Sequence, residues 1–155
     1  MAGRAPYVAV IGPGEATDSE VEVAQTVGRL LAEAGTVVVC GGLGGVMAGA
    51  CRGAAAAGGL TVGILPGTDR AAANEWVAVA IPTGLGELRN GLVVRAADAV
   101  IAVGGAHGTL SEIALGLKTG VPVVGVGTWE IDGVERADGA EDAVARALGR
   151  VAPRT

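Results

Sequence analysis

The sequence predicts an α/β domain built on a doubly wound parallel sheet. Short runs rich in Val and Ile alternate with longer segments of helical pattern, and Gly or Pro bounds the short runs. The short runs are apolar throughout rather than at every second position, as is typical of parallel strands covered by helices on both faces. A repeated strand–helix–strand order joins such strands by right-handed crossovers, so these segments are predicted to form one sheet.

Six segments have the strand pattern and are expected to build the sheet. Phe is absent and the aromatic share is only 2%, so Val, Ala, Leu and Ile must fill the space between strands and helices. Half of the residues are hydrophobic, which is enough for a sizeable core. The predicted strands are residues 7–11, 36–40, 61–65, 76–81, 99–103 and 121–126.

Helical segments follow most of these strands. Asp18 or Ser19 is expected to cap the first helix, which runs to about Ala34 and stops at Gly35. The chain shows no linker, internal repeat or change in composition, so residues 1–155 are predicted to form a single Rossmann-like domain. The other helices are predicted at residues 45–57, 87–97, 109–117 and, as a short last helix, about 141–148.

Charge and cysteine content exclude several classes of function. With 11 basic and 16 acidic side chains the net charge is −5, which argues against a broad surface for nucleic acid or for an anionic membrane. Cys40 and Cys51 are too few for a disulfide framework or a zinc site, and no metal site is predicted. The first residues lack the apolar core of a signal peptide, and no apolar run reaches the length of a membrane span, so we expect a cytoplasmic protein.

Glycine is concentrated where the predicted strands end. Gly-Pro-Gly follows the first strand, Gly-Gly-Leu-Gly-Gly the second and Gly-Gly-Ala-His-Gly-Thr the fifth. Open α/β sheets bind ligands at the carboxyl ends of their strands, and glycine lets backbone amides approach a ligand beside the positive end of a helix dipole. We therefore predict a phosphate site, although a glycine-rich chain also needs glycine in ordinary turns. The residues assigned to this site are Gly12, Gly41, Gly42, Gly44, Gly45, Gly105, Gly108 and Thr109.

Two common phosphate-binding motifs do not fit these loops. A Walker loop needs Gly-Lys-Ser or Gly-Lys-Thr, but the only lysine, Lys118, lies at the end of a predicted helix. The dinucleotide fingerprint requires Gly or Ala where the first loop has Thr17, and Pro13 removes an amide donor there. A P-loop is therefore excluded and an NAD site is not favoured.

Three stretches of the chain resemble the Lonely Guy superfamily of Rossmann-like proteins. They are GGLGGVMAGACRGAAAAGG, GILPG and RNGLVVRAADAVIAVGGAHGTLSEIALGLKTGVPVVGV, and the similarity extends from about Val8 to Val126. The family signature Pro-Gly-Gly-x-Gly-Thr-x-x-Glu corresponds to the segment from Gly104 to Glu112. Arg89 matches the arginine of the family's Arg-Lys pair. The chain departs from the family pattern at Asn90, Gly104, Ala106 and Ser111, which replace Lys, Pro, Gly and a frequent first Glu.

The resemblance implies a phosphoribohydrolase. The enzymes of the superfamily split a nucleoside 5′-monophosphate into its base and ribose 5-phosphate, and no metal or other cofactor is required. On this interpretation Thr109 and the loop amides hold the phosphate, while the catalytic residues are Arg89, which orients the substrate, and Glu112, which supports the ribosyl cation. Related proteins form homodimers, so a homo-oligomer, a dimer or larger, is expected.

The departures from the family pattern point to a second interpretation. They bring the chain closer to a branch that includes molybdenum-cofactor carrier proteins, which bind rather than cleave; the DNA-processing A proteins are more distant relatives. The protein would then be a carrier or sensor that holds the molybdenum cofactor or a nucleotide in the same pocket. In either case the expected partner is a small molecule of nucleotide or molybdopterin type. The longest loop, residues 66–75, could cover such a ligand, and the sequence does not decide its role.

Each candidate side chain also has a simpler interpretation. Glu112 follows Thr109 by three residues, a pattern that also predicts a helix-capping carboxylate. A lone arginine such as Arg89 is usually a solvated surface charge. Asn90 could contact a polar edge of the ligand or begin a helix. His107, the only histidine, could act as acid or base, but a place in the wall of the binding pocket is favoured.

Overall fold

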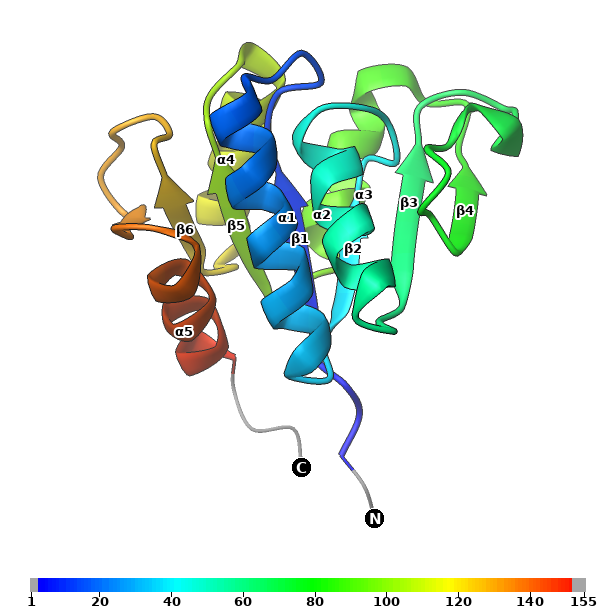
Figure 1. Ribbon diagram of the computed structural model, residues 1–155. Helices are drawn as coiled ribbons and strands as arrows, with labels where there is room; N and C mark the ends of the chain where they lie inside the picture. The colour runs from blue at the N-terminus through cyan, green and yellow to red at the C-terminus, as the bar shows by residue number, and fades with distance from the viewer. Residues whose placement is uncertain (1–2, 152–155) are drawn as a thin grey trace.

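A parallel sheet of seven strands forms the centre of the structure (Figure 1). The structure is a computed structural model, and it describes residues 3–151. The strands are β1 (Tyr7–Ile11), β2 (Val37–Cys40), β3 (Thr61–Leu65), β4 (Val79–Pro82), β5 (Ala99–Val103), β6 (Val123–Val126) and β7 (Glu135–Arg136). Neighbouring strands pair in parallel, in the order β4-β3-β2-β1-β5-β6-β7, which confirms the predicted Rossmann-like α/β fold.

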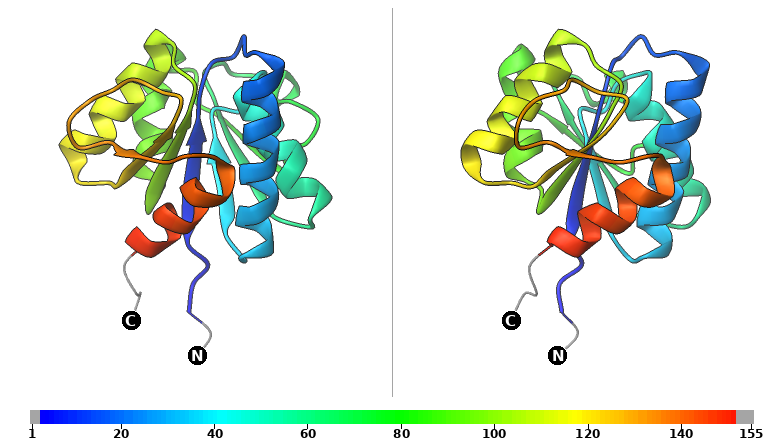
Figure 2. Two further views of the ribbon diagram at one scale, coloured as in Figure 1. Left: turned by 60° about the vertical axis from the view of Figure 1, so that its left-hand side comes forward. Right: turned by 90° about the vertical axis from the view of Figure 1, so that its left-hand side faces the viewer.

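Helices cover both faces of this sheet (Figure 2). They are α1 (Asp18–Glu33), α2 (Val46–Ala56), α3 (Asn90–Arg95), α4 (His107–Thr119) and α5 (Ala140–Arg150), with two short 3-10 helices, η1 (Arg70–Ala72) and η2 (Gly86–Arg89). α1, α2 and α5 pack on one face, and α3 and α4 pack on the other. Within β1, Val8 and Val10 point into the first core, whereas Ala9 and Ile11 point into the second. Because both faces are buried, the strands are apolar throughout.

The first helix is capped one residue earlier than expected. Thr17, rather than Asp18 or Ser19, is the N-cap. Its hydroxyl accepts a hydrogen bond from the N–H of Glu20 at 3.1 Å, and the Glu20 carboxylate accepts one from the N–H of Thr17 at 3.0 Å. This reciprocal capping box satisfies N–H groups that the first turn of a helix leaves free. After the other end of α1, Gly35 adopts a φ of +74°, in agreement with the predicted stop.

Other elements differ from their predicted bounds for local reasons. The fourth strand begins at Val79 instead of residue 76, because the Thr61 hydroxyl donates to the carbonyl of Trp76 at 2.7 Å and holds that segment in a loop. The sixth strand begins only at Val123, after Pro122, which has no N–H to donate to a sheet. The helix expected at 87–97 is divided into η2 and the short helix α3.

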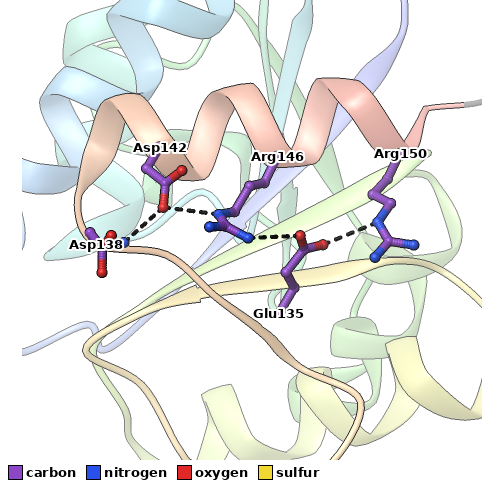
Figure 3. Close-up of polar contacts among 5 residues, drawn as sticks. All are labelled: Glu135, Asp138, Asp142, Arg146 and Arg150. Carbon is purple, nitrogen blue, oxygen red and sulfur yellow. Dashed lines mark hydrogen bonds and ion pairs between the residues drawn. The ribbon is translucent and has the colours of Figure 1, made fainter.

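A network of ion pairs joins β7 to α5 (Figure 3). The Glu135 carboxylate accepts from Arg146 at 3.0 Å and from Arg150 at 3.1 Å. Asp142 accepts from Nε of Arg146 at 2.9 Å and from the N–H of Asp138 at 3.0 Å. The hydrogen bond from Arg146 lowers the pKa of Glu135, and the N–H of Asp138 does the same for the pKa of Asp142. β7 is too short to give a recognisable strand pattern in the sequence. Its ion pairs with α5 hold this strand against that helix.

The strand order brings three glycine loops together. β1 lies between β2 and β5, so the loops that follow these three strands are neighbours at the carboxyl edge of the sheet. From β1 the chain builds outward through β2 and β3 to β4, and then returns to place β5 on the other side of β1. Such a switch in direction leaves a crevice between the loops, where open α/β sheets bind their ligands.

Candidate functional site

A cavity of about 300 Å³ lies at this switch point, between the loops that follow β1, β2 and β5. Seven of the residues predicted to form the site line it together: Gly12, Gly41, Arg89, Asn90, Gly108, Thr109 and Glu112. The prediction missed the other lining residues, which are Val10, Ile11, Pro13, Gly14, Leu43, Met47 and Ala106. Most of these are apolar and carry no chemical signal, whereas the position of Gly14 in a glycine loop could have indicated it.

Arg89 brings a buried positive charge to this cavity. It is the last residue of η2 and is only 9% exposed, so the interpretation as a solvated surface charge is wrong. Nε donates to the carbonyl of Ile64 at 3.0 Å, Nη2 donates to the carbonyl of Gly41 at 3.4 Å, and Nη1 donates to the side-chain oxygen of Asn90. No carboxylate of residues 3–151 forms an ion pair with it. A buried charge without such a partner favours the binding of an anion.

Gly41 leaves the space that the guanidinium of Arg89 occupies. A Cβ at this position would lie 2.7 Å from Nη2 of Arg89 and 2.8 Å from Sδ of Met47. Gly12 is packed as closely, since a Cβ there would lie 2.4 Å from the carbonyl oxygen of Val103. Close packing of the cavity wall therefore requires glycine at both positions, a reason different from the free amides on which the prediction rested.

The N-terminus of α4 faces the cavity. The helix begins at His107, two residues earlier than predicted, and its N-cap, Ala106, has no side chain that could bond to the first turn. The N–H groups of the first three residues are therefore left without helical partners, and together with the helix dipole they attract anions. Because Thr109 lies inside the helix, the interpretation of Glu112 as a capping carboxylate is wrong.

Besides the free N–H groups of α4, the cavity wall contains a hydroxyl, that of Thr109, without a hydrogen-bond partner among the described residues. The residue is 2% exposed, and its Oγ1 has no hydrogen-bond partner within residues 3–151. Buried hydroxyl groups are nearly always hydrogen-bonded in folded proteins. A bound ligand with an acceptor oxygen would satisfy this group.

Glu112 lies one helical turn beyond Gly108 and is 8% exposed. Burial raises the pKa of its carboxyl group from 4.5 to about 7, although the charge of Arg89 acts in the opposite direction. The carboxyl group is therefore divided between its protonated and ionised forms near neutral pH. A group in this state can either give or take a proton, and such shifts are common at functional sites.

Asn90 and Ser111, which depart from the family pattern, are hydrogen-bonded to each other. The Asn90 side chain accepts from Arg89 and donates to the Ser111 hydroxyl at 3.2 Å. Ser111 in turn donates to the carbonyl of Gly108 at 2.6 Å. Asn90 also begins α3, one of the two roles considered for it, and it lines the cavity. This uncharged chain of hydrogen bonds connects Arg89 to the first turn of α4.

The other predicted glycines of the second loop lie outside the cavity lining. Gly42, Gly44 and Gly45 shape the turn from β2 into α2. Gly45 has a φ of +60°, and a Cβ there would lie 2.2 Å from the carbonyl oxygen of Pro13. The N–H of Asn74 donates to the carbonyl of Gly42 at 2.9 Å. The loop at 66–75 thus supports the second glycine loop from outside and does not line the cavity.

Gly105 and His107 also lie beside the cavity rather than in its lining. Gly105 lies against the indole of Trp129, and a Cβ on it would lie 3.0 Å from Nε1. His107 is exposed, and its ring is stacked against Trp129 with centroids 6.2 Å apart and planes inclined by 25°. Both residues therefore belong to a contact between the start of α4 and the segment after β6.

Cys40 and Cys51 are buried and free, with their sulfur atoms 3.4 Å apart. They contribute to the core as small side chains, as expected. Across residues 3–151, no group of three or more His, Cys, Asp or Glu side chains is arranged to hold a metal ion. In the same part of the chain, no helix combines the length and the apolar character that crossing a membrane requires.

The chain matches a known family over almost its whole length. The model described as the SLOG cluster4 family covers residues 5–149. The chain belongs to the SLOG cluster4 family. An uncharacterized protein from Archaeoglobus fulgidus is 45% identical over 113 residues, which are 73% of this chain and 74% of that protein.

Two solved structures of proteins named for the molybdenum cofactor resemble this member of the SLOG cluster4 family. The molybdenum cofactor binding protein from the phototrophic bacterium Rippkaea orientalis is 37% identical, with a TM-score of 0.91 over 96% of this chain and 99% of that one. The molybdenum cofactor carrier protein from Chlamydomonas reinhardtii is 33% identical, with a TM-score of 0.89 over 97% of this chain and 100% of that one. The predicted resemblance to the branch that includes such carriers is confirmed.

Proposed function

We propose that the protein binds a phosphorylated ligand of pterin or nucleotide type and acts as a carrier of the molybdenum cofactor. One observation supports this most directly: the buried guanidinium of Arg89 lines the cavity without a carboxylate paired to it among the described residues. In a cavity of about 300 Å³, such a charge favours a compact anion over a neutral ligand.

The groups around Arg89 suit a phosphate. The first turn of α4 offers free N–H groups, and Thr109 adds a hydroxyl that has no partner within residues 3–151. Phosphate oxygens accept hydrogen bonds from guanidinium, hydroxyl and backbone N–H groups together. The donors are local, so the net charge of −5 does not oppose a small anion, whereas it disfavours nucleic acid as the partner.

Asn90 and Ser111 favour binding over cleavage. Neither carries a charge, and both are held in the hydrogen-bonded chain that runs from Arg89 to α4. Among the described residues Glu112 is the one carboxylate that lines the cavity, whereas glycoside hydrolysis commonly uses two. The likeness to a cofactor-binding and a carrier protein supports the same conclusion.

Calorimetric titration with the molybdenum cofactor, under exclusion of oxygen, tests the carrier role. We expect saturable binding that weakens at least about tenfold in Arg89→Gln, because a charged hydrogen-bond donor is lost. Arg95→Gln is the matched control, since Arg95 lies on α3, is exposed and does not line the cavity. Equal affinity in wild type and Arg89→Gln would contradict the proposal.

Hydrolysis of nucleoside 5′-monophosphates is a second candidate function. The observation that favours it is the buried carboxyl group of Glu112 in the cavity wall, since burial raises its pKa to about 7, a value that suits a group that gives or takes a proton. The test is incubation with a panel of nucleoside 5′-monophosphates and chromatography for free base and ribose 5-phosphate. Hydrolysis at this site would fall at least about 100-fold in Glu112→Gln. If the wild type releases neither free base nor ribose 5-phosphate, the hydrolase role is wrong and only the carrier role remains.

A further inference from the structure

A second cavity, of about 630 Å³, lies outside the site described above. The segment between β6 and β7, residues 127–134, forms an open loop beside α4 (Figure 2). Its residues provide most of the lining of this cavity. The apolar part of the wall consists of Trp129, Ile131 and Val134. The cavity has about twice the volume of the first one, so it can hold a larger group than a phosphate.

Trp129 joins the walls of the two cavities. Its Nε1 donates to the carbonyl of Ala106 at 3.2 Å, and Ala106 lines the first cavity while Trp129 lines the second. The close contact with Gly105 and the stacking on His107 hold the indole against the start of α4. Ala106 at the start of α4 therefore belongs to the wall of the first cavity and also contacts Trp129 in the wall of the second.

The charges of the two cavities are opposite in character. In the first, Arg89 faces a carboxyl group, Glu112, that is partly protonated near neutral pH. In the second, two carboxylates, Glu130 and Asp132, stand against one guanidinium, that of Arg136. Arg136 pairs with Glu130 at 3.3 Å, and Asp132 forms no ion pair within residues 3–151. The second cavity is therefore less suited to phosphate than the first and offers acceptors to a group rich in N–H donors.

A planar nitrogen heterocycle meets these conditions. Its face can stack on the indole of Trp129, and its edge can donate to the carboxylate of Asp132. A carboxylate pairs best with two adjacent N–H donors, which the 2-amino-4-oxopyrimidine edge of guanine and of pterins supplies. Thr128 adds a buried hydroxyl whose Oγ1 has no partner within the described part of the chain.

We propose that this second cavity holds the heterocycle of the phosphorylated ligand, and that this heterocycle is of the 2-amino-4-oxopyrimidine type. The proposal rests on the proposed function, because it needs the phosphate to lie beside Arg89. The two cavities then orient the ligand through charge: its anionic end binds at α4, and its donor-rich ring binds in the loop between β6 and β7.

Calorimetry with three compounds separates the two cavities. Ribose 5-phosphate probes the phosphate site alone, GMP adds the complete heterocycle, and IMP lacks its amino group; chromatography after each titration checks that the ligand is intact. We expect GMP to bind about tenfold more tightly than ribose 5-phosphate, with IMP between them. If ribose 5-phosphate does not bind, the phosphate site and this proposal are both wrong. If it binds and GMP binds no tighter, only the second cavity is wrongly assigned.

Variants in the loop give an independent test. Trp129→Ala should lose about tenfold in affinity for GMP and keep its affinity for ribose 5-phosphate, whereas Trp129→Phe retains a stacking ring and should bind GMP nearly as the wild type does. Asp132→Asn should bind GMP and IMP equally. Trp76→Phe, at the other tryptophan, is the control and should change neither ligand. Equal losses for GMP and ribose 5-phosphate in Trp129→Ala would overturn the proposal, because Trp129 would then only support the start of α4.

Discussion

At the scale of single residues, a buried guanidinium and a buried carboxyl group share one small cavity without forming an ion pair. Arg89 is held by two carbonyl groups and by Asn90, and the pKa of Glu112 rises to about 7 because the group is buried. The positive charge therefore remains available to a ligand, most of all when Glu112 is protonated.

Glu112→Gln is expected to make the stability less dependent on pH. The folded pKa of about 7 lies above the unfolded value of 4.5, so the contribution of protonated Glu112 is fully present below about pH 4.5 and is lost as the pH rises through 7. The wild type should lose about 2 kcal/mol more than the variant between pH 5.5 and 8. Urea unfolding at both pH values measures this difference. Parallel pH dependence in the two proteins would contradict the burial of Glu112.

Gly41→Ala is expected to weaken the phosphate site by displacing Arg89. The new Cβ would lie 2.7 Å from Nη2, so the guanidinium must move. We expect the affinity for ribose 5-phosphate to fall about tenfold as a result. Gly44→Ala is the control, because its nearest contact, the carbonyl oxygen of Gly14 at 3.5 Å, leaves room for a methyl group. Calorimetry on both variants checks the prediction, which is wrong if they bind alike.

At the scale of elements, the helices differ in what the free N–H groups of their first turns bind. α1 satisfies its free N–H groups with the capping box of Thr17 and Glu20. α4 begins after Ala106, which provides no cap, and its first turn faces the cavity instead. The first arrangement stabilises the fold, and the second leaves donors for an anion.

Thr17→Ala is expected to lower the free energy of unfolding by about 1 kcal/mol, because the N-cap hydroxyl is lost. Ser19→Ala is the matched control: Ser19 is exposed, lies inside the first turn and does not supply the cap. Urea unfolding of both variants at the same pH provides the measurement. Similar losses in both would mean that Thr17 does not act as the cap.

At the scale of the whole molecule, apolar side chains are exposed along one edge of the sheet. β4 is the last strand on that side, and η2 and α3 follow it in the chain. The exposed residues of this region are Val79, Ile81, Leu85, Leu88 and Leu92. Exposed apolar patches of this kind commonly mark contacts between proteins, which supports the expected homo-oligomer.

Light scattering after size exclusion is expected to give a dimer or a larger assembly. Leu88, at 75% exposure, is the most exposed large apolar side chain of the described residues, so Leu88→Glu should shift the protein toward the monomer. Leu60→Glu, at an exposed site outside this region, is the control and should keep the assembly. A wild type that is monomeric at micromolar concentration would refute the expectation.

The sequence by itself determined the fold class, six of the seven strands and the glycine loops beside the cavity. These features depend on apolar periodicity and on glycine, which act over a few neighbouring residues. The resemblance to a known family added Arg89 and Glu112, and both line the same cavity.

Only the tertiary structure decided how these residues are placed. The bond between Asn90 and Ser111 joins positions 21 apart in the chain, and the burial that raises the pKa of Glu112 depends on every element around it. Trp129, in the wall of the second cavity, is held by a hydrogen bond to Ala106, 23 residues away. Local patterns determine helices and strands, whereas desolvation and pairing are set by segments that meet only when the sheet has formed.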